Sequence, residues 1–352
     1  MTNCLEEDLN HILSHTQDLW QELEGQRVFI TGGTGFFGCW LLESFVWAVD
    51  VLKVNATALV LTRNFEAFKK KAPHLANHPA LSFLIGDVRS FEFPQGKFSH
   101  IIHAATEASA QFNAKYPLEM FDTIVEGTRH TLDLARVCSA EKVLLISSGA
   151  VYGKQPPDIE RISESYLGAP DTTNPLSTYG EGKRAAELLC TIYSETFSFE
   201  TKIARCFAFV GPYLPLDRSF AAGNFIRDFL NGRPIVMSGN GTPLRSYLYA
   251  GDLAIWLWTI LASGLNSQPY NVGSEDGRSI FDIASMIAGF SNSQLEIIRS
   301  ENSDLVGAPD PYIPSTQKAK EELDLQTWIC VESAFQRTIQ WLYFSRNQPS
   351  GP

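Results

Sequence analysis

The segment Arg27-Val-Phe-Ile-Thr31 runs directly into Gly32-Gly33-Thr34-Gly35-Phe36-Phe37-Gly38, and a long apolar segment of helical character follows. Glycines at 32, 35 and 38 permit a tight turn, close approach of the backbone to a pyrophosphate, and close packing of a helix on the preceding strand. The first turn of that helix offers free N–H groups and a positive dipole end to phosphates. The sequence therefore predicts a dinucleotide site with contacts from Gly32, Thr34, Gly35, Phe36, Phe37 and Gly38.

Short β-rich apolar runs alternate with longer helical ones on both sides of this turn. The expected strands are Arg27–Thr31, Ala58–Thr62, Leu81–Gly86, His100–His103 and Lys142–Ser147, and the clearest helices are Phe36–Val51 and Pro117–Cys138. Strands separated by helices indicate βαβ units and a parallel sheet. The predicted fold class is α/β, a Rossmann-type doubly wound parallel sheet with a smaller C-terminal substrate-binding lobe.

Four segments are expected along the chain. Residues 1–24 carry apolar side chains near helical spacing and predict an amphipathic helix. Residues 25–207 form the dinucleotide-binding domain. Glycines and prolines interrupt shorter elements from 208 to 346, which we interpret as a mixed lobe for the substrate, and residues 347–352 are expected to form a tail.

Composition excludes several classes of function. The formal net charge of −11 disfavours nucleic acid as a partner, so anionic ligands must be held by local arginines and backbone amides. No run reaches the roughly 18 apolar residues of a membrane span, and the six cysteines are scattered, which favours a cytoplasmic protein with reduced thiols and no membrane partner. The pairs His11/His15 and His74/His78 lack a third ligand nearby in sequence, so no metal site is expected.

The second expected strand ends in Leu61-Thr62-Arg63, where an acidic residue would suit a free ribose 2′-hydroxyl. An arginine suits a 2′-phosphate, so the cofactor is expected to be NAD or NADP with a preference for NADP, although Arg63 stacking on adenine or facing solvent remains open. Asp87, after the third strand, is a candidate acceptor for the adenine amino group, with a simple turn aspartate as the alternative.

Tyr179 and Lys183 begin a later helical run, and their spacing of four places both side chains on one helix face. A lysine ammonium near a phenol stabilises the phenolate, which gives a base that acts near neutral pH. Ser147-Ser148, at the end of an earlier strand, supplies a hydroxyl to complete the group.

With these motifs in place, the chain resembles the extended short-chain dehydrogenase/reductases, in particular the NAD-dependent epimerase/dehydratase group that acts on nucleotide-sugars. Besides the turn and the Tyr179–Lys183 motif, the matching segments are His103-Ala-Ala105, Glu126-Gly-Thr128, Ser147-Ser-Gly-Ala-Val-Tyr-Gly153, Gly211-Pro212, Arg245-Ser-Tyr-Leu-Tyr-Ala-Gly-Asp252 and Tyr270-Asn-Val-Gly273.

The resemblance implies a role for each matching residue. Tyr179 is the catalytic base or acid, Lys183 bridges to the nicotinamide ribose, and Ser148 binds the reacting sugar oxygen. Asn224 and Arg245 meet the nucleotide diphosphate of the substrate, which suits a guanidinium. Val88, Ala104 and Ala105 join the cofactor contacts.

The resemblance also implies a homodimer. In its interface, the helix after Pro117 and the helix of Tyr179 pack against the same two helices of the partner subunit. The spare apolar positions expected there include Leu132, Leu188, Leu189 and Ile192.

The residues after Ser148 depart from part of the family pattern. Sugar 4,6-dehydratases of the family carry an Asp-Glu pair there, and decarboxylases carry a glutamate at the second place, whereas this chain has Gly149 and Ala150. A second departure is Ala208, where many relatives have an asparagine. We therefore expect an epimerase first, then a 4-ketoreductase or 4,6-dehydratase, and a decarboxylase less. Glu181 is a candidate replacement acid, and a catalytically silent nucleotide-binding protein is the non-enzyme alternative.

Overall fold

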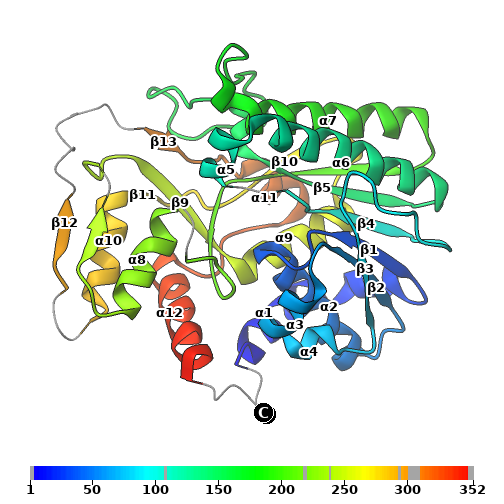
Figure 1. Ribbon diagram of the computed structural model, residues 1–352, viewed down its shortest axis with the longest axis horizontal. Coiled ribbons are helices and arrows are strands. Elements are labelled where there is room, and N and C mark those ends of the chain that lie inside the picture. Colours follow the sequence, from blue (N-terminus) through cyan, green and yellow to red (C-terminus); the bar gives the residue numbers. More distant parts are fainter. Residues whose placement is uncertain are drawn as a thin grey trace.

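A computed structural model describes residues 4–106, 109–216, 220–237, 239–291, 295–299 and 310–347. Its centre is a parallel sheet of seven strands in the order β10-β6-β5-β4-β1-β2-β3 (Figure 1). The strands are β1 (Arg27–Thr31), β2 (Thr57–Thr62), β3 (Leu81–Ile85), β4 (His100–His103), β5 (Lys142–Ser148), β6 (Glu200–Cys206) and β10 (Pro269–Val272). The predicted Rossmann-type doubly wound sheet is confirmed, and the five expected strands all lie in it.

Apart from the edge strand β3, the strands are buried on both faces, and their apolar residues are nearly continuous, as is typical of parallel sheets. In β1, Val28 and Ile30 join one core while Phe29 joins the other. The first core also receives α2 (Phe36–Leu52) and α9 (Ala250–Ser263), and the second receives α6 (Pro117–Val137) and α7 (Thr178–Thr196). Figure 1 shows α6 and α7 side by side over one face of the sheet.

Shorter elements connect these layers. They are α3 (Phe65–Lys71), α4 (Pro73–Ala76), α5 (Ala110–Lys115), α11 (Gln317–Leu323) and the 3₁₀ turns η2 (Gly149–Tyr152) and η3 (Pro175–Ser177). Proline stands at the start of α6 and of η3, where its missing N–H is not needed.

The N-terminal segment is not one continuous α-helix. The helix α1 (Glu6–Thr16) is followed by the 3₁₀ helix η1 (Gln17–Leu23), and Leu9, Ile12 and Trp20 are buried. The end of α1 is held by the Thr16 hydroxyl, which donates to the carbonyl of Ile12 and accepts from the indole of Trp20. The amphipathic pattern thus located a docked segment but not its change of helix type.

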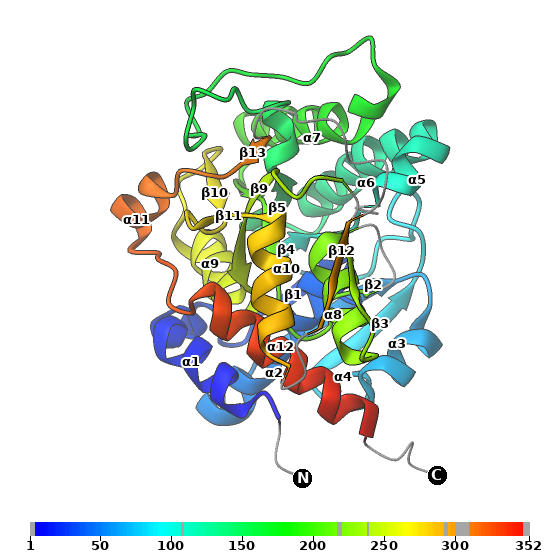
Figure 2. The ribbon, with the colours of Figure 1, turned by 90° about the vertical axis from the view of Figure 1, so that its left-hand side faces the viewer.

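The smaller lobe contains a second sheet of four strands and a separate strand pair. Strand β9 (Leu244–Tyr249) pairs with β7 (Ala208–Val210), β11 (Gly277–Ser279) and β13 (Pro311–Tyr312), and β8 (Ile235–Met237) pairs with β12 (Ile297–Arg299). Its helices are α8 (Ala221–Leu230), α10 (Ile280–Gly289) and α12 (Val331–Asn347). Figure 2 shows α12 crossing near α1, where Arg337 pairs with Glu7 and Asp8.

The chain crosses back from this lobe into the large sheet. Strand β10 pairs with β6, and α9 packs against β5, β6 and α2. Of the expected tail, Asn347 ends α12, and residues 348–352 lie outside the described residues. No helix in the described ranges is long and apolar enough to span a bilayer.

Candidate active site

Backbone contacts in the glycine turn between β1 and α2 leave no room for a side chain at Gly32 or Gly38. Gly32 has φ +71°, and a Cβ there would lie 2.5 Å from the carbonyl of Ala104. A Cβ at Gly38 would lie 2.4 Å from the backbone of Gly32 and Gly33. At exposed Gly35 a Cβ would meet only the oxygen of Gly32, at 3.3 Å, so this glycine borders open space. The turn therefore fits a pyrophosphate that approaches the chain at Gly35.

The N-terminus of α2 is available to an anion. Gly35 is the N-cap and provides no side-chain bond to the helix, so the first-turn N–H groups of Phe36 and Phe37 need another acceptor. The turn is braced from outside by Lys71, whose Nζ donates to the Thr34 carbonyl at 3.1 Å. This arrangement suits phosphate groups, and the first turn of α2 contains no acidic residue that would repel them.

The adenosine end of the predicted cofactor site contains an arginine that the sequence reasoning missed. Arg89 makes a bidentate ion pair with Asp87, at 2.8 and 2.9 Å, and this pair lowers the pKa of Asp87. Arg63 is exposed and close enough to contribute to the same lowering of the Asp87 pKa. The signal in the sequence was the Asp-Val-Arg spacing after β3. Asp87 therefore interacts with two cations, which complicates its predicted role as an acceptor for adenine.

Three further residues were expected to contact the cofactor, namely Val88, Ala104 and Ala105. The Val88 side chain is buried against Gly127 of α6, so it serves packing. Ala104 faces the turn of Gly32, and the amide of Ala105 donates to the Thr31 hydroxyl at 3.2 Å.

Tyr179 and Ser148 meet where β5 ends against α7. Ser148 caps the turn η2 by accepting the amide of Ala150 at 3.1 Å. Burial raises the pKa of Tyr179 to about 12, and the nearby hydroxyl of Ser148 opposes that rise. The predicted pair is thus together, but in the free protein the phenol is protonated.

Lys183 lies one turn further along α7, with Nζ 5.9 Å from the centre of the Tyr179 ring. Its Nζ donates to the Thr106 hydroxyl at 2.9 Å and to the carbonyl of Ile146 at 2.8 Å. Burial lowers the pKa of Lys183 to about 8. An ammonium with two donors already used keeps one for a cofactor hydroxyl, which agrees with the role that the resemblance implied.

A buried network holds α7 against the sheet beside these residues. Glu187, one turn after Lys183, accepts from Ser147 at 2.5 Å and from Arg205 of β6 at 2.7 Å. Arg205 also donates to the Tyr152 hydroxyl, which in turn donates to Asn271 of β10. Removing Glu187 or Arg205 would leave the other charge unpaired, so the ion pair helps to hold α7 against β6.

The space beyond Ser148 is filled by two aromatic residues that the sequence reasoning did not single out. A Cβ at Gly149 would lie 2.7 Å from the Tyr312 hydroxyl and 2.7 Å from the ring of Phe207. The two rings pack against each other at a tilt of 36°, with centroids 4.6 Å apart. Gly149 is therefore glycine for a steric reason, and neither it nor Ala150 brings a carboxyl group to the site.

The two predicted substrate residues lie in the smaller lobe. Arg245 of β9 is opposite Tyr312 in the β13 register, and its guanidinium lies 5.8 Å from the Tyr312 ring centre and 3.2 Å from Asp310 Oδ2. Arg245 therefore borders the catalytic group through Tyr312. Asn224 lies on α8, where its side-chain oxygen accepts from Arg227 at 3.0 Å. Its predicted contact with substrate remains a prediction.

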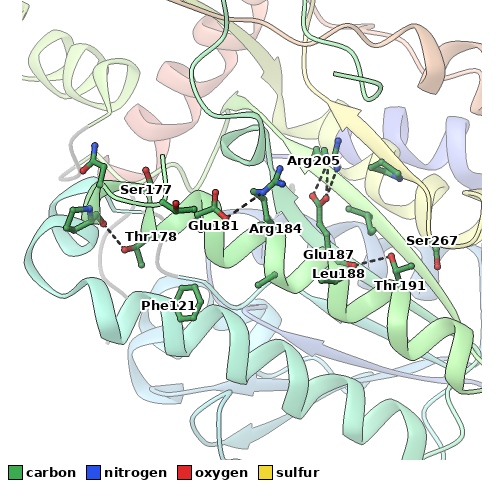
Figure 3. A pocket seen from close by; sticks show the side chains of 16 residues that line it. Phe121, Ser177, Thr178, Glu181, Arg184, Glu187, Leu188, Thr191, Arg205 and Ser267 are labelled. Atoms are coloured by element: carbon green, nitrogen blue, oxygen red, sulfur yellow. Dashed lines mark hydrogen bonds and ion pairs between the residues drawn. The ribbon is translucent and has the colours of Figure 1, made fainter. Parts of the chain in front are cut away.

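A cavity of about 790 Å³ runs along the outer side of α7 (Figure 3). Neither Tyr179 nor Lys183 lines it, so it is separate from the catalytic group. Glu181 lines it and lies 3.6 Å from Arg184. Two residues along an α-helix correspond to about 200° of rotation, which explains why Glu181 points away from Tyr179 and is poorly placed as a replacement acid.

The fold and this Ser148-Tyr179-Lys183 group beside a glycine turn define a Rossmann-type protein of the short-chain dehydrogenase/reductase class. The model of the "NAD dependent epimerase/dehydratase family" matches residues 28–273. UDP-glucuronic acid decarboxylase 6 of Arabidopsis thaliana is 31% identical over 299 residues, which cover 84% of this chain and 83% of the relative. The chain belongs to the NAD-dependent epimerase/dehydratase family.

Other similar proteins carry different names within this family. UDP-glucuronic acid decarboxylase 1 of Danio rerio is 29% identical over 92% of this chain and 74% of the relative. Among solved structures, UDP-glucose 4-epimerase of Thermotoga maritima has a TM-score of 0.78 at 16% identity and covers 92% of this chain and 100% of its own. UDP-glucuronic acid 4-epimerase of Bacillus cereus, solved with UDP-glucuronic acid and NAD, has a TM-score of 0.77 at 20% identity, covering 91% and 100%.

Proposed function

We propose that this protein is a nucleotide-sugar 4-epimerase that oxidises the sugar at C4 and returns the hydride to the opposite face. The observation that carries the proposal is the Ser148-Tyr179-Lys183 group combined with a site wall, at Gly149 and Ala150, that has no carboxyl. A nicotinamide dinucleotide, when bound, supplies the hydride acceptor and donor. Tyr179 removes the C4 hydroxyl proton, Ser148 holds the C4 oxygen, and Lys183 favours the phenolate.

The absence of a carboxyl group at Gly149 and Ala150 also disfavours elimination of water. A 4-keto sugar loses water across C5 and C6 when one group removes the C5 proton and another protonates the leaving hydroxyl, and each such group contributes typically about 10²–10⁴-fold. Gly149 offers only a hydrogen atom, and the space over it is filled by Tyr312 and Phe207. Glu181 is on the outer side of α7. We therefore rank a 4,6-dehydratase lower than an epimerase or a 4-ketoreductase.

A decarboxylase is the second candidate, because the two curated relatives above are UDP-glucuronic acid decarboxylases. A carboxylate next to a 4-keto group is a β-keto acid, which loses carbon dioxide without a further acid at position 149. The missing glutamate at Ala150 counts against this candidate because the C5 position must be reprotonated afterwards.

One experiment separates these candidates. Purified protein with NAD⁺ or NADP⁺ is incubated with UDP-glucose, UDP-glucuronic acid and dTDP-glucose, and products are analysed by mass spectrometry and proton NMR. Epimerisation keeps the mass and inverts the C4 coupling pattern, decarboxylation loses carbon dioxide, and dehydration loses water. Robust loss of water would overturn the proposal. No turnover, together with tight dinucleotide binding, would leave a 4-ketoreductase or a catalytically silent nucleotide-binding protein, and oxidation of NADPH or NADH by a supplied 4-keto sugar would identify the 4-ketoreductase.

We further propose that the dinucleotide is NADP, since Arg63 and Arg89 bring two guanidinium groups near the end of β2 and β3. A ribose 2′-phosphate matches this charge better than a free hydroxyl does. Arg89 and Asp87 form an ion pair without net charge, so Asp87 does not repel the phosphate and Arg63 supplies the net positive charge.

Arg63→Ala is expected to weaken NADP⁺ binding by about 1–3 kcal/mol, the cost of one charge-assisted contact, and to change NAD⁺ binding little. Binding is measured by calorimetry. Lys97→Ala is the matched control, because Lys97 is exposed and precedes β4, at the opposite end of the parallel strands. Equal losses for both dinucleotides, or tighter binding of NAD⁺ by the unchanged protein, would reverse the assignment.

We propose a homodimer through the outer faces of α6 and α7. Figure 3 shows Phe121 of α6 and Leu188 of α7 beside the outer cavity, and Leu118, Leu188 and Ile192 are exposed by 79, 61 and 48%. Exposed apolar side chains gathered on adjacent helices are typical of an interface. Leu132 and Leu189, which were expected there, are buried in the core instead, because α6 and α7 also pack on each other.

Leu188→Glu is expected to shift the protein from dimer to monomer, because a charge replaces an apolar contact. Sedimentation velocity at micromolar concentration reports the change. Leu265→Glu provides the control, since Leu265 is exposed by 54% but follows α9, on another part of the surface. A monomeric unchanged protein would contradict the proposed interface.

A further inference from the structure

The space over Gly149 is bordered by two aromatic side chains that the reaction proposed above does not use. A Cβ at Gly149 would lie 2.7 Å from the Tyr312 hydroxyl and 2.7 Å from the ring of Phe207. Both members of this aromatic pair are half-buried, so part of each residue remains accessible. Because Gly149 directly follows Ser148, which holds the C4 oxygen in the proposed reaction, the aromatic pair borders the sugar next to its reacting carbon.

The aromatic pair is held in place from both lobes. Phe207 follows β6 of the large sheet, and its amide donates to the carbonyl of Val272 at 3.0 Å. Tyr312 comes from β13 of the smaller lobe, and its ring packs on that of Phe207 at a tilt of 36°, with centroids 4.6 Å apart. Packing therefore holds the phenol hydroxyl at the edge of an apolar surface.

The aromatic pair offers a neutral hydrogen-bond donor. Burial raises the pKa of Tyr312, so its hydroxyl stays protonated at neutral pH. The guanidinium of Arg245 lies 5.8 Å from the Tyr312 ring centre, and the carboxylate of Asp310 is paired with that guanidinium at 3.2 Å. A sugar oxygen beside Tyr312 therefore meets an O–H donor, and it can be an alcohol or a carboxylate oxygen.

Among the groups beside C4 on a hexose ring, the C6 group matches the aromatic pair best. C3 carries its hydroxyl directly, whereas C5 carries C6, a carbon whose oxygen lies one bond further out. Such a carbon gains apolar contact from an aromatic ring, while its oxygen gains a hydrogen bond from the hydroxyl at the edge of that ring. A C3 hydroxyl at the same place would leave the Phe207 ring without an apolar partner.

We infer that Tyr312 is a specificity-determining residue whose hydroxyl binds the C6 oxygen of the sugar, while the Phe207 ring contacts C6. The inference rests on the proposed function, because it takes Ser148 as the group that holds the C4 oxygen. The Ser148 hydroxyl accepts the Ala150 amide at 3.1 Å, which leaves its proton and a second lone pair for that role. Sugars with and without C6 are then distinguished by the aromatic pair, and no side chain at position 149 is needed.

The test compares nucleotide-sugars that differ only at C6, with the protein saturated with NADPH or NADH so that the sugar is not oxidised. Calorimetry measures the Kd of UDP-xylose, which lacks C6, of UDP-glucose, whose C6 is an alcohol, and of UDP-glucuronic acid, whose C6 is a carboxylate. Tyr312→Phe removes the hydroxyl and keeps the ring on Phe207. It is expected to weaken UDP-glucose roughly 3–10-fold, for a lost neutral hydrogen bond, and UDP-glucuronic acid roughly 10–100-fold, for a lost bond to a charged group. The Kd of UDP-xylose should change less than about twofold.

Tyr270→Phe is the matched control, because its hydroxyl donates to Glu322 at 2.7 Å, on α11, and none of the three affinities should move. Gly149→Ala supplies a second variant that keeps the Tyr312 hydroxyl. The added Cβ would meet that hydroxyl and the Phe207 ring at 2.7 Å, so the aromatic pair must move. This variant should also lose more affinity for the two sugars that carry C6 than for UDP-xylose, which keeps the test decisive if Tyr312→Phe is unstable.

Equal losses for all three sugars in Tyr312→Phe, or a loss that persists with UDP-xylose and disappears with UDP-3-deoxyglucose, would overturn the inference. The same series is measured with dTDP-sugars if the protein binds these and not UDP-sugars. The proposed epimerase activity fails separately, in the mass and NMR experiment, because these affinities do not depend on which reaction follows oxidation at C4. If no nucleotide-sugar binds, the nucleotide-sugar assignment fails first and the inference fails with it.

Discussion

Replacing Tyr179 with phenylalanine is expected to lower turnover by about 10²–10⁴-fold, the usual contribution of a positioned general acid or base. The change removes one hydroxyl and leaves the ring in place, so affinity for the dinucleotide should stay within a few-fold of the original. The loss should fall on kcat more than on KM, because the missing interaction belongs to the transition state. Single-turnover hydride transfer, followed by nicotinamide absorbance, measures it directly.

Tyr193→Phe is the control for this prediction. Tyr193 lies on the same helix, and its hydroxyl donates to Asp133 at 2.9 Å, away from Ser148. Its loss should leave turnover nearly unchanged. Retention of more than a tenth of the activity by Tyr179→Phe would mean that another group is the base.

Replacing Lys183 with alanine is expected to damage turnover, dinucleotide affinity and stability together. It removes the cation beside Tyr179 and leaves the half-buried hydroxyl of Thr106 and the buried carbonyl of Ile146 without their donor. The unsatisfied carbonyl of Ile146 costs about 1–3 kcal/mol of unfolding free energy. Chemical denaturation and calorimetric binding of the dinucleotide give the two quantities.

Lys202→Ala separates the functional loss from the structural one. Lys202 is also buried, on β6, and its Nζ donates to the carbonyl of Gly264. It should lose stability but retain affinity for the dinucleotide. A Lys183→Ala variant that binds the dinucleotide as tightly as the Lys202→Ala variant would refute the proposed bridge to the ribose.

The stability deficit of Lys183→Ala should also depend on pH. The pKa of Lys183 is lowered by burial from 10.5 to about 8, so between these values the unfolded chain binds more protons than the folded one. Unfolding free energy therefore rises with pH across this window in the unchanged protein. The variant lacks that rise, and its deficit should grow from pH 8 toward pH 10.5.

The local parts of this fold and site could be predicted from the sequence. Strands β1 and β4 have the expected bounds because each is a short apolar run buried on both faces. The Tyr179-Lys183 spacing fixes a shared helix face, and the glycines at 32 and 38 are required by backbone contacts around the turn. Such features depend on helix and turn geometry, which short segments carry by themselves.

The parts that depend on distant pairing were missed. The Tyr312 hydroxyl reaches the space over Gly149 only because β13 pairs with β9, and no periodicity near Tyr312 indicates that pairing. Leu132 and Leu189 were expected at a subunit surface because helix periodicity cannot distinguish a neighbouring helix of the same chain from a partner. Arg89 was missed for a different reason. Its spacing from Asp87 could be read directly in the sequence, but no ion pair was inferred from it.

The return of the chain to the large sheet has a consequence for how the protein is made. On the ribosome, a nascent chain that ends after β6 exposes the edge that β10 later covers, and it lacks α9, whose buried Trp256 and Trp258 close one face of the sheet. Parallel pairing of this kind cannot form until Val272 has left the exit tunnel. The first half of the chain therefore depends on the second to complete its core, and we expect a nascent chain stalled at Phe207 to be sensitive to protease.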